Sequence, residues 1–189
     1  MPLPHASEWQ VHDCAGRRKY LNPAERQAFL AAADRRDAPT LALCYVLAFT
    51  GCRISEALAL QRHQFDPHLL TLRFRTLKRR RLIYRDVPVP LIVGTVLTSL
   101  PLLPDERFWN MHRATAWRHI RAVMEEAKIA GPMACCRGLR HAYGVLAAAH
   151  SIPPGLLQRW LGHADISTTL IYVNAVGIEE RRLAERMWK

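Results

Sequence analysis

The residues best suited to act on a phosphate are three arginines in two short motifs. Arg53 lies in the run Thr-Gly-Cys-Arg-Ile-Ser-Glu at 50–56, at the corner between two predicted helices, and Arg137 and Arg140 lie one turn apart at the start of another. A guanidinium can donate two parallel hydrogen bonds to phosphate oxygens and stays charged. Such arginines could hold a phosphodiester and neutralise the charge that develops during attack on it. Glu56, one turn after Arg53, could brace that guanidinium, or simply pair with it as a structural bridge.

Two further side chains could supply the bond-making and proton-transfer steps. His163 closes the run Gln-Arg-Trp-Leu-Gly-His just past a predicted helix end, and Tyr172 closes the run Thr-Thr-Leu-Ile-Tyr. Cutting a DNA strand without a metal requires a nucleophile in line with phosphorus and an acid that protonates the departing 5′ oxygen. A phenol suits the attack because phenolate leaves more readily than an alkoxide, so the covalent step can reverse. Histidine or lysine suits the proton transfer.

A basic hairpin is a second place where the chain could meet a polyanion. Residues 69–75 and 82–89 contain alternating apolar positions, which predicts two antiparallel strands. The segment that joins the strands carries one candidate acid and three candidate phosphate-binding residues: Lys78, Arg79, Arg80 and Arg81. An ammonium can lose its proton where a guanidinium cannot, which favours Lys78 as an acid. A charged hairpin tip is also often merely solvated, so both interpretations stay open.

The overall charge agrees with a nucleic-acid partner. The 189 residues include 27 Lys and Arg against 16 Asp and Glu, a formal net charge of +11. Such an excess is typical of proteins that bind nucleic acid or, less often, an anionic membrane, although it can also serve solubility alone. Half of the residues are apolar, which fits a globular chain rather than a disordered one.

The elements that must position these residues are mostly helical. Asn22 and Pro23 begin a helix that runs to about residue 33, and Pro39 opens another that Gly51 is suited to end. We expect a mainly α fold with a small antiparallel β-sheet (α+β). An N-terminal arm is predicted over residues 1–20 and a single domain over 21–189. Further helices are predicted over residues 55–60, 91–100, 114–130, 139–149, 153–161, 168–173 and 178–187.

Several features that the sequence lacks narrow the cellular location and the kinds of bound group that can be expected. The apolar stretch at 41–49 is too short to cross a bilayer, and residues 1–10 have neither the basic nor the apolar region of a secretory signal. The five cysteines lack metal-ligand spacing and are predicted to be reduced thiols. We therefore expect a cytoplasmic protein with no membrane contact and no metal held by its cysteines.

Four motifs together resemble the tyrosine recombinase family, also called the phage integrase family. They are Thr-Gly-Cys-Arg-Ile-Ser-Glu at 50–56, Gly-Leu-Arg-His at 138–141, Gln-Arg-Trp-Leu-Gly-His at 158–163 and Thr-Thr-Leu-Ile-Tyr at 168–172. Each motif alone is a weak signal, but the four occur in the family's order, and the resemblance spans about residues 21–174. It implies the fold of the family's catalytic domain.

The resemblance also implies a role for each matching residue. Arg53 and Arg140 would clamp the scissile phosphate, and Lys78 would be the general acid for the 5′ hydroxyl. His163 would contact the phosphate and assist proton transfer, and Tyr172 would form the 3′-phosphotyrosyl bond. Two positions complete the expected site: the catalytic position held by Arg137 and the supporting acidic position held by Glu56.

Two departures from the family pattern affect these expectations. The family most often has His where Arg137 stands, and Arg137 can donate to phosphate but cannot act as a base. The proton acceptor is then expected to be His163 or water. His141 is expected to point about a third of a turn away from Arg140, which predicts a structural role. The second departure is the short segment before the pattern, which suggests a compact form without the N-terminal core-binding domain, an excised catalytic domain or a natural remnant.

The function implied by the resemblance is site-specific recombination of double-stranded DNA. It would proceed through a 3′-phosphotyrosyl intermediate, without cofactor, to integrate, excise, invert or resolve a mobile element. Four copies would act on two DNA sites, with a monomer possible when DNA is absent. The predicted helix at 178–187 would pack on a neighbouring copy or on its own core. A catalytically weak DNA-binding regulator is the main alternative, and a type IB topoisomerase is a lesser one. A metal-dependent nuclease is least favoured because clustered carboxylates are missing.

Overall fold

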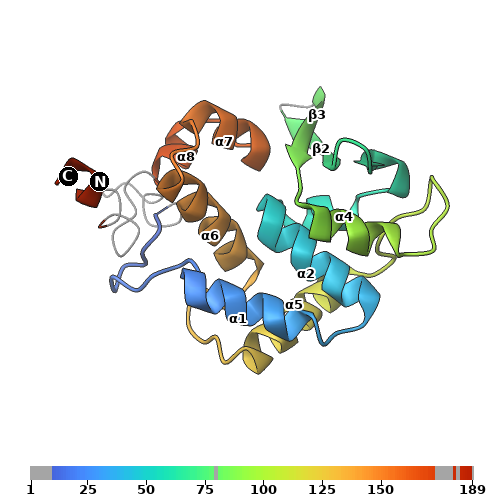
Figure 1. The fold of residues 1–189 in the computed structure, drawn as a ribbon, viewed down its shortest axis with the longest axis horizontal. Helices are drawn as coiled ribbons and strands as arrows, with labels where there is room; N and C mark the ends of the chain where they lie inside the picture. Colours follow the sequence, from blue (N-terminus) through green and yellow to red (C-terminus); the bar gives the residue numbers. More distant parts are fainter. Residues whose placement is uncertain (1–9, 79–80, 173–180, 182–183, 189) are drawn as a thin grey trace, which may run out of the picture.

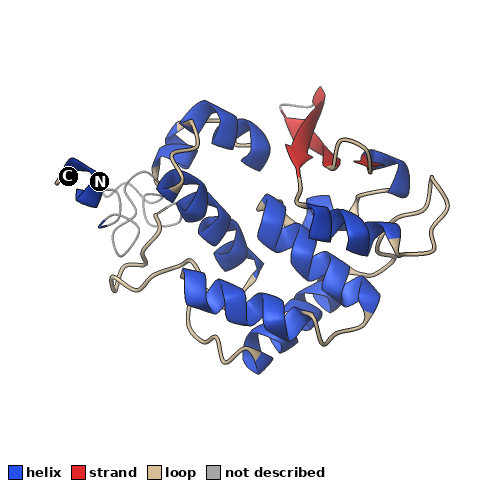
Figure 2. Ribbon diagram, viewed as in Figure 1, coloured by secondary structure: helices blue, strands red, loops and turns tan. Residues whose placement is uncertain are grey.

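The computed structural model describes residues 10–78, 81–172, 181 and 184–188 (Figure 1). Within these residues, helices dominate and one three-stranded antiparallel sheet lies at the edge of the molecule (Figure 2). The expected mixture of many helices with a small sheet is confirmed. The helices are α1 (Pro23–Ala33), α2 (Ala38–Thr50), α3 (Ile54–Leu58), α4 (Leu91–Thr98), α5 (Arg113–Glu126), α6 (Cys136–Ala149), α7 (Pro154–Leu161) and α8 (Ser167–Leu170), with single 3₁₀ turns η1 (Arg62–Gln64) and η2 (Glu185–Met187).

The start of α1 and the end of α2 form where the sequence signals predict them. The Asn22 side chain accepts from the Glu25 backbone, and the Glu25 carboxylate accepts from the Asn22 backbone, each at 2.8 Å. This capping box satisfies N–H groups that the first turn of α1 leaves unpaired. Asp37 caps α2, and α2 ends at Gly51 in the left-handed region. The first two helices are therefore fixed largely by local chemistry.

Helix α2 is the centre of the core. Its residues from Ala42 to Ala48 are buried on every side, and α1, α4, α5 and α6 pack around it (Figure 1). A helix that is apolar all round has to be enclosed in this way. The segment before α1 also contributes to the core, because Val11 and Tyr20 are buried.

The sheet has the order β1 (Phe65–Asp66), β2 (Thr71–Lys78) and β3 (Arg81–Pro88). Leu72 pairs with Val87 and Phe74 with Arg85, and all four side chains are buried on the face toward the helices. The expected inward alternation holds at Leu72 and Val87, but Ile83 lies on the same face of β3 and remains 42% exposed. An arginine, rather than an apolar residue, fills the inward position between Ile83 and Val87.

Several predicted helix boundaries differ from the structure by a few residues. Helix α5 ends at Glu126 because Lys128 adopts a positive φ, so the helix does not reach residue 130. Helix α6 begins at Cys136 rather than at 139, which places Arg137 and Arg140 on one helix. The predicted helix at 178–187 lies mostly outside the described residues.

Candidate active site

The corner between α2 and α3 presents Arg53. The α2 helix ends at Gly51 with φ of 61°, a conformation that side chains rarely tolerate. A Cβ on Gly51 would also approach Tyr143 Cδ1 to 2.8 Å. The chain then turns directly into α3 with Arg53 as the N-cap, and the Arg53 backbone N–H donates to Glu56 Oε2 at 2.8 Å. The tight corner thus fixes the backbone from which the Arg53 side chain projects.

Glu56 is a buried carboxylate that ties this corner to the sheet. Its Oε2 accepts from Arg85 Nη2 at 2.8 Å, and its Oε1 accepts from Arg85 Nη1, Arg53 Nη1 and the Thr76 hydroxyl, each at 3.1 Å. Burial would raise the pKa of Glu56, but the hydrogen bonds and charges of Arg85 and Arg53 hold that pKa below its ordinary value. The carboxylate therefore stays ionised and braces Arg53, as predicted, while its second partner is an arginine that the sequence analysis missed.

Arg85 connects the sheet to α7. Only 4% of its side chain is exposed. Its Nε donates to the Trp160 carbonyl at 2.9 Å, and its guanidinium lies 4.9 Å from the centre of the Phe74 ring. A Cβ on Gly162 would come within 3.0 Å of that guanidinium, so glycine is the residue that leaves room for it. A signal existed in the sequence, since Arg85 occupies the inward face of β3 with Val87.

Arg140 joins three elements of the site. From α6 it donates to the Gly51 carbonyl at 2.7 Å and to the Leu161 carbonyl at 2.9 Å, which are the ends of α2 and α7. Burial, with the nearby positive charge of Arg53, lowers the pKa of Arg140 to about 10. The guanidinium groups of Arg140 and Arg53 lie close enough to repel each other, and a bound anion would offset this repulsion.

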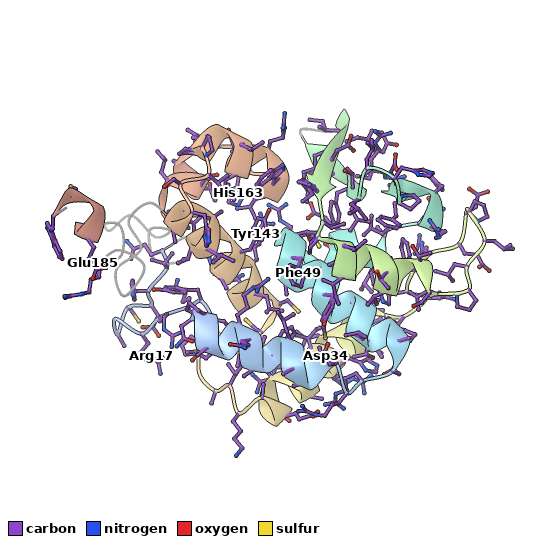
Figure 3. The ribbon with its side chains drawn as sticks, in the orientation of Figure 1. Arg17, Asp34, Phe49, Tyr143, His163 and Glu185 are labelled. Atoms are coloured by element: carbon purple, nitrogen blue, oxygen red, sulfur yellow. The ribbon has the colours of Figure 1, made fainter. Side chains whose placement is uncertain are left out.

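Tyr172 is enclosed between His163 and α6. Its ring stacks on the His163 ring with centroids 6.3 Å apart and an interplanar angle of 21°. On the other side it contacts Gly144, where an added Cβ would lie 2.5 Å from the Tyr172 Cζ. His163 follows the left-handed Gly162 at the end of α7 (Figure 3). Its Nδ1 lies 2.7 Å from the Thr169 hydroxyl. The α7–α8 connection thus seats both rings against α6.

The electrostatics of these rings reflect burial among cations. Burial raises the pKa of Tyr172 to about 12, although the charges of Arg140 and Arg53 act to lower it. Burial and the charge of Arg140 lower the pKa of His163 to about 3. At neutral pH the phenol is therefore protonated and the His163 imidazole is neutral. Attack by Tyr172 would require its proton to be accepted as the new bond forms.

His141 lies beside Tyr172, a contact that its expected direction relative to Arg140 did not predict. Its Nδ1 lies 3.2 Å from the Tyr172 hydroxyl oxygen, and both side chains are buried. The expectation measured direction from Arg140, whereas Tyr172 approaches α6 from the side of Gly144. His141 and Gly144 are three residues apart and share that face of the helix.

One cavity of about 480 Å³ gathers most of the predicted catalytic residues. Arg53, Arg137, Arg140, His141 and Tyr172 all line it. The structure thus brings Arg53 and Arg140, the arginines predicted to bind phosphate, to the same cavity as Tyr172. His163 stacks on the Tyr172 ring, and Glu56 supports Arg53 from behind.

The structure describes only part of the hairpin tip. The Lys78 backbone pairs with Arg81 at the end of β2, on the strand that carries Thr76 of the Glu56 cluster. The side chains of Lys78 and Arg81 lie outside the described part of the structure, as do Arg79 and Arg80 altogether. The roles predicted for these four residues stay predictions.

Comparison with known proteins identifies the family. The pattern of the phage integrase family matches residues 19–176. The chain belongs to the phage integrase family. Over 173 residues it is 30% identical to the tyrosine recombinase XerD of Pseudomonas putida, covering 82% of this chain and 57% of XerD. The resemblance drawn from the four motifs is confirmed.

Solved structures agree on the fold of this phage integrase family member. It is similar to XerA recombinase with a TM-score of 0.77 and 23% identity, over 89% of this chain and 64% of that chain. It is also similar to XerH site-specific recombinase bound to difH substrate in a pre-cleavage complex, with a TM-score of 0.71 and 21% identity, over 94% of this chain and 60% of that chain. The expected recombinase fold is confirmed, and the chain spans less than two thirds of each of these three proteins.

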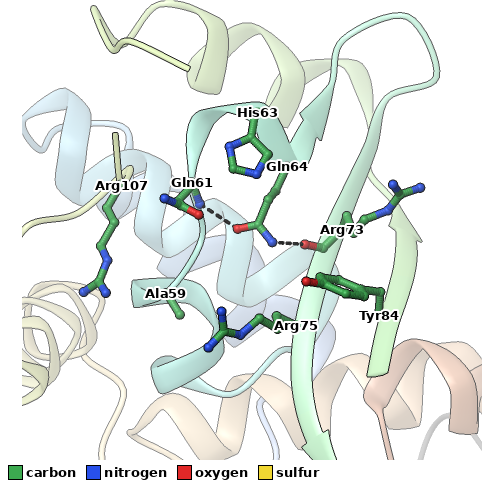
Figure 4. Close-up of a pocket in the computed structure, with 8 residues that line it drawn as sticks. All are labelled: Ala59, Gln61, His63, Gln64, Arg73, Arg75, Tyr84 and Arg107. Carbon is green, nitrogen blue, oxygen red and sulfur yellow. Dashed lines mark hydrogen bonds between the residues drawn. The ribbon is translucent and has the colours of Figure 1, made fainter. Parts of the chain in front are cut away.

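Two further cavities of this integrase-family chain are lined by arginines. Arg53 and Ser55 also line a cavity of about 400 Å³, whose wall includes Ala59 and Arg75. Ala59 and Arg75 in turn line a third cavity of about 540 Å³, together with Arg107. Figure 4 shows Arg75 and Arg107 on either side of Ala59 in this third cavity. Shared residues thus link the three cavities into one path across the corner and the outer face of the sheet.

Two further observations concern metals and membranes. Among the described residues, no group of three or more His, Cys, Asp or Glu side chains is placed to hold a metal ion. In the same part of the chain, every helix is too short or too polar to cross a bilayer.

Proposed function

We propose that this phage integrase family chain carries the catalytic site of a site-specific tyrosine recombinase, which cleaves and rejoins double-stranded DNA through a 3′-phosphotyrosyl intermediate. One observation carries the proposal: the Tyr172 phenol lines the same cavity as the Arg53 and Arg140 guanidinium groups. A phosphodiester held by two guanidinium groups there would lie beside an oxygen nucleophile.

The clamp arginines would act on the transition state. As Tyr172 attacks, negative charge grows on the non-bridging phosphate oxygens. Arg53 and Arg140 could each donate two hydrogen bonds to those oxygens, and Arg137 on the cavity rim could add a further contact. The carbonyl groups that anchor Arg140 and the carboxylate that anchors Arg53 hold these donors before substrate arrives. Donors positioned in advance need little reorganisation during the reaction.

The departing 5′ oxygen needs a proton, and the proposal assigns it to Lys78. The β2 strand carries both Lys78 and Thr76, and Thr76 is hydrogen bonded to Glu56 beside Arg53. The hairpin is therefore anchored at the base of the site, two residues from the proposed acid. An ammonium can give up a proton and later take it back, as rejoining of the strand requires.

DNA is the proposed partner because the surface path from the active site is basic. The three linked cavities are lined by arginines from the α2–α3 corner, the outer face of the sheet and α6. The net charge of +11 adds attraction for a polyanion. The similar XerH was solved with its difH substrate, which supports the same partner class here. Integration, excision, inversion and resolution, and a tetramer on two sites, are part of the proposal for the complete protein.

A nicked duplex tests the proposal directly. The Tyr172→Phe variant would first select binding sites from a random-sequence duplex library, and a selected site would then be nicked next to candidate cleavage positions. We expect the wild-type chain to accumulate a protein–DNA adduct that resists denaturation, because the short 5′-hydroxyl fragment diffuses away before rejoining. Adduct formation, measured by denaturing electrophoresis, should vanish in Tyr172→Phe.

A matched control is available on α6. Tyr143 is partly buried, with its pKa raised to about 12 by burial, but it does not line the cavity of Arg53, Arg140 and Tyr172. Tyr143→Phe should form the adduct at the wild-type rate. Site-selective binding without any adduct would instead favour the DNA-binding regulator, which the arginine at position 137 makes the leading alternative.

A further inference from the structure

The hydroxyl of Tyr172 has a buried partner that the family resemblance did not assign. Its oxygen lies 3.2 Å from His141 Nδ1, and the two rings meet edge to face with centroids 5.8 Å apart. Only 2% of Tyr172 and 4% of His141 is exposed, so bulk water has little access to this contact. An imidazole nitrogen is therefore the hydrogen-bond partner that the structure gives to this oxygen.

The other nitrogen of this imidazole is uncommitted. His141 Nε2 is buried and has no hydrogen-bond partner among the residues that the structure describes. No second bond forces one tautomer on the ring, so Nε2 can carry the proton while Nδ1 presents its lone pair to the phenol. A buried polar atom left unpaired costs free energy, and here the unpaired Nε2 is the atom that can carry the ring proton.

The other candidates for accepting the phenol proton are less suitable. Arg137 stands where the family usually has His, and a guanidinium cannot act as a base. His163 lies face to face with the Tyr172 ring, and its Nδ1 is engaged with the Thr169 hydroxyl. Among these three side chains, His141 is the one with a nitrogen beside the hydroxyl oxygen of Tyr172, which carries the proton.

Packing on α6 brings the phenol to His141. Gly144 lies one turn further along the same face of α6, and the Tyr172 ring packs directly against it. Any side chain at 144 would occupy the space of the ring, because even a Cβ would lie 2.5 Å from Tyr172 Cζ. The close approach allowed by Gly144 and the hydrogen bond to His141 act on the same ring.

We infer that His141 is a catalytic residue: it orients the Tyr172 hydroxyl and accepts its proton at Nδ1 during attack on the phosphodiester. This inference rests on the proposed function. The Tyr172 oxygen forms the new bond to phosphorus as its proton passes to Nδ1. The bond from phosphorus to the 5′ oxygen breaks, its electron pair stays on that oxygen, and the oxygen takes a proton from Lys78. In rejoining, His141 returns the proton to the departing phenolate.

The surrounding charges keep His141 ready for this role. Burial and the positive charges of Lys19, Arg140 and Arg137 lower its pKa to about 4, so the imidazole is neutral at pH 7. His163 and Tyr172, which also face it, are uncharged at that pH. A phosphodiester bound between the clamp arginines would offset part of this positive charge and favour protonation of His141 as the reaction proceeds.

The test compares His141→Asn with wild type on the nicked duplex described above. Asn can hold the phenol oxygen by a hydrogen bond but cannot take a proton at neutral pH. We expect the rate of adduct formation at pH 7 to fall by about 10²–10⁴-fold, the usual contribution of a general base. The wild-type rate should change little from pH 6 to 9. The variant rate should rise about tenfold per pH unit, because solvent base must then remove the proton.

Controls separate catalysis from folding and from binding. His150→Ala on the same helix removes an exposed histidine remote from the cavity and should leave the rate unchanged. Affinity for the duplex should be retained in His141→Asn. In His141→Ala, added imidazole should restore adduct formation, because removal of the ring enlarges a cavity of about 480 Å³ that His141 lines. Gly144→Ala should slow the reaction by displacing the phenol, and imidazole should not rescue it.

The outcomes are distinct. Adduct formation by His141→Asn at the wild-type rate would overturn the role of His141 while leaving the proposed recombinase intact. A loss that is equal at every pH and not rescued by imidazole in His141→Ala would mean a structural role and would also overturn it. Absence of any adduct with wild type would refute the proposed function itself, and with it this inference.

Discussion

The two faces of the β2–β3 hairpin carry ion pairs of the same length in opposite surroundings. On the inner face Arg85 meets Glu56 at 2.8 Å, with 4% and 8% of the two side chains exposed. On the outer face Arg73 meets Asp86, also at 2.8 Å, with 60% and 48% exposed. Arg85 and Asp86 are consecutive residues, so the strand itself directs one into the core and the other to solvent.

The difference shows that burial, rather than distance, sets what an ion pair does. Water screens the outer pair and competes for its hydrogen bonds, so it contributes little and leaves the face free to meet a ligand. The inner pair is shielded from water, so its charges are stabilised by hydrogen bonds within the protein. Those hydrogen bonds connect the pair to the α2–α3 corner and to α7. The inner face therefore positions the active site, and the outer face presents charge.

Removal of Arg85 should have the largest effect on stability. Arg85→Ala leaves the Glu56 carboxylate buried with fewer partners, and breaking a buried pair in this way typically costs about 3–5 kcal/mol. We expect a loss of this order in the free energy of unfolding measured with urea. Arg73→Ala, the matched change on the outer face, should alter the unfolding midpoint very little. Equal losses in the two variants would contradict the distinction between the faces.

Acid should affect the Glu56–Arg85 pair more than the Asp86–Arg73 pair, because the buried carboxylate contributes more to stability when it is ionised. The pKa of Glu56 is held below its ordinary value by Arg85 and Arg53, so its pairing stabilises the fold above about pH 4.5 and this contribution is lost as the pH falls through the lowered pKa. Glu56→Gln should remove that part of the pH dependence below pH 4.5.

Asp86→Asn supplies the control for the acid experiment. The pKa of Asp86 is also lowered, by its hydrogen bonds to Arg73, but its exposure to water makes the contribution small. The free energy of unfolding of Asp86→Asn should therefore vary with pH almost as that of wild type does. The buried His141 and His163, whose pKa values are lowered, also lose stabilisation as pH falls below 6.5, but they do so equally in both variants. A profile for Glu56→Gln that matches wild type would show that Glu56 is not held ionised by its partners.

The inner face also marks where sequence reasoning reached its limit. The capping of α1 and the glycine end of α2 could be predicted because each signal lies within a few residues of its effect. The brace between Glu56 and Arg53 could be predicted for the same reason. The Glu56–Arg85 pair spans 29 residues and depends on how the sheet docks on α3, which alternation along one strand does not specify.

The active site divides in the same way. The family motifs identified Arg53, Arg140 and Tyr172, and the structure places all three around one cavity. The contact of His141 with Tyr172 was missed because it depends on which side of α6 the α8 segment approaches. That side is set by Gly144, whose missing side chain admits the ring. A glycine next to a motif can therefore be as informative about a nucleophile's position as the motif itself.

The outer face should show its role in binding rather than in stability. Arg75 and Arg107 line a cavity that Tyr172 does not line, and each could contact a DNA phosphate next to the site of cleavage. Removing one such contact should weaken binding of the selected duplex by about tenfold and flatten the plot of log affinity against log salt by about one unit. Arg75→Ala with Arg107→Ala should therefore change the slope by about two units while urea unfolding stays unchanged. Arg35, which pairs with Glu126 away from these cavities, provides the matched control, and Arg35→Ala should leave the slope intact. If the double variant binds with the wild-type salt dependence, DNA does not follow the outer face of the hairpin, and the charge there serves another purpose.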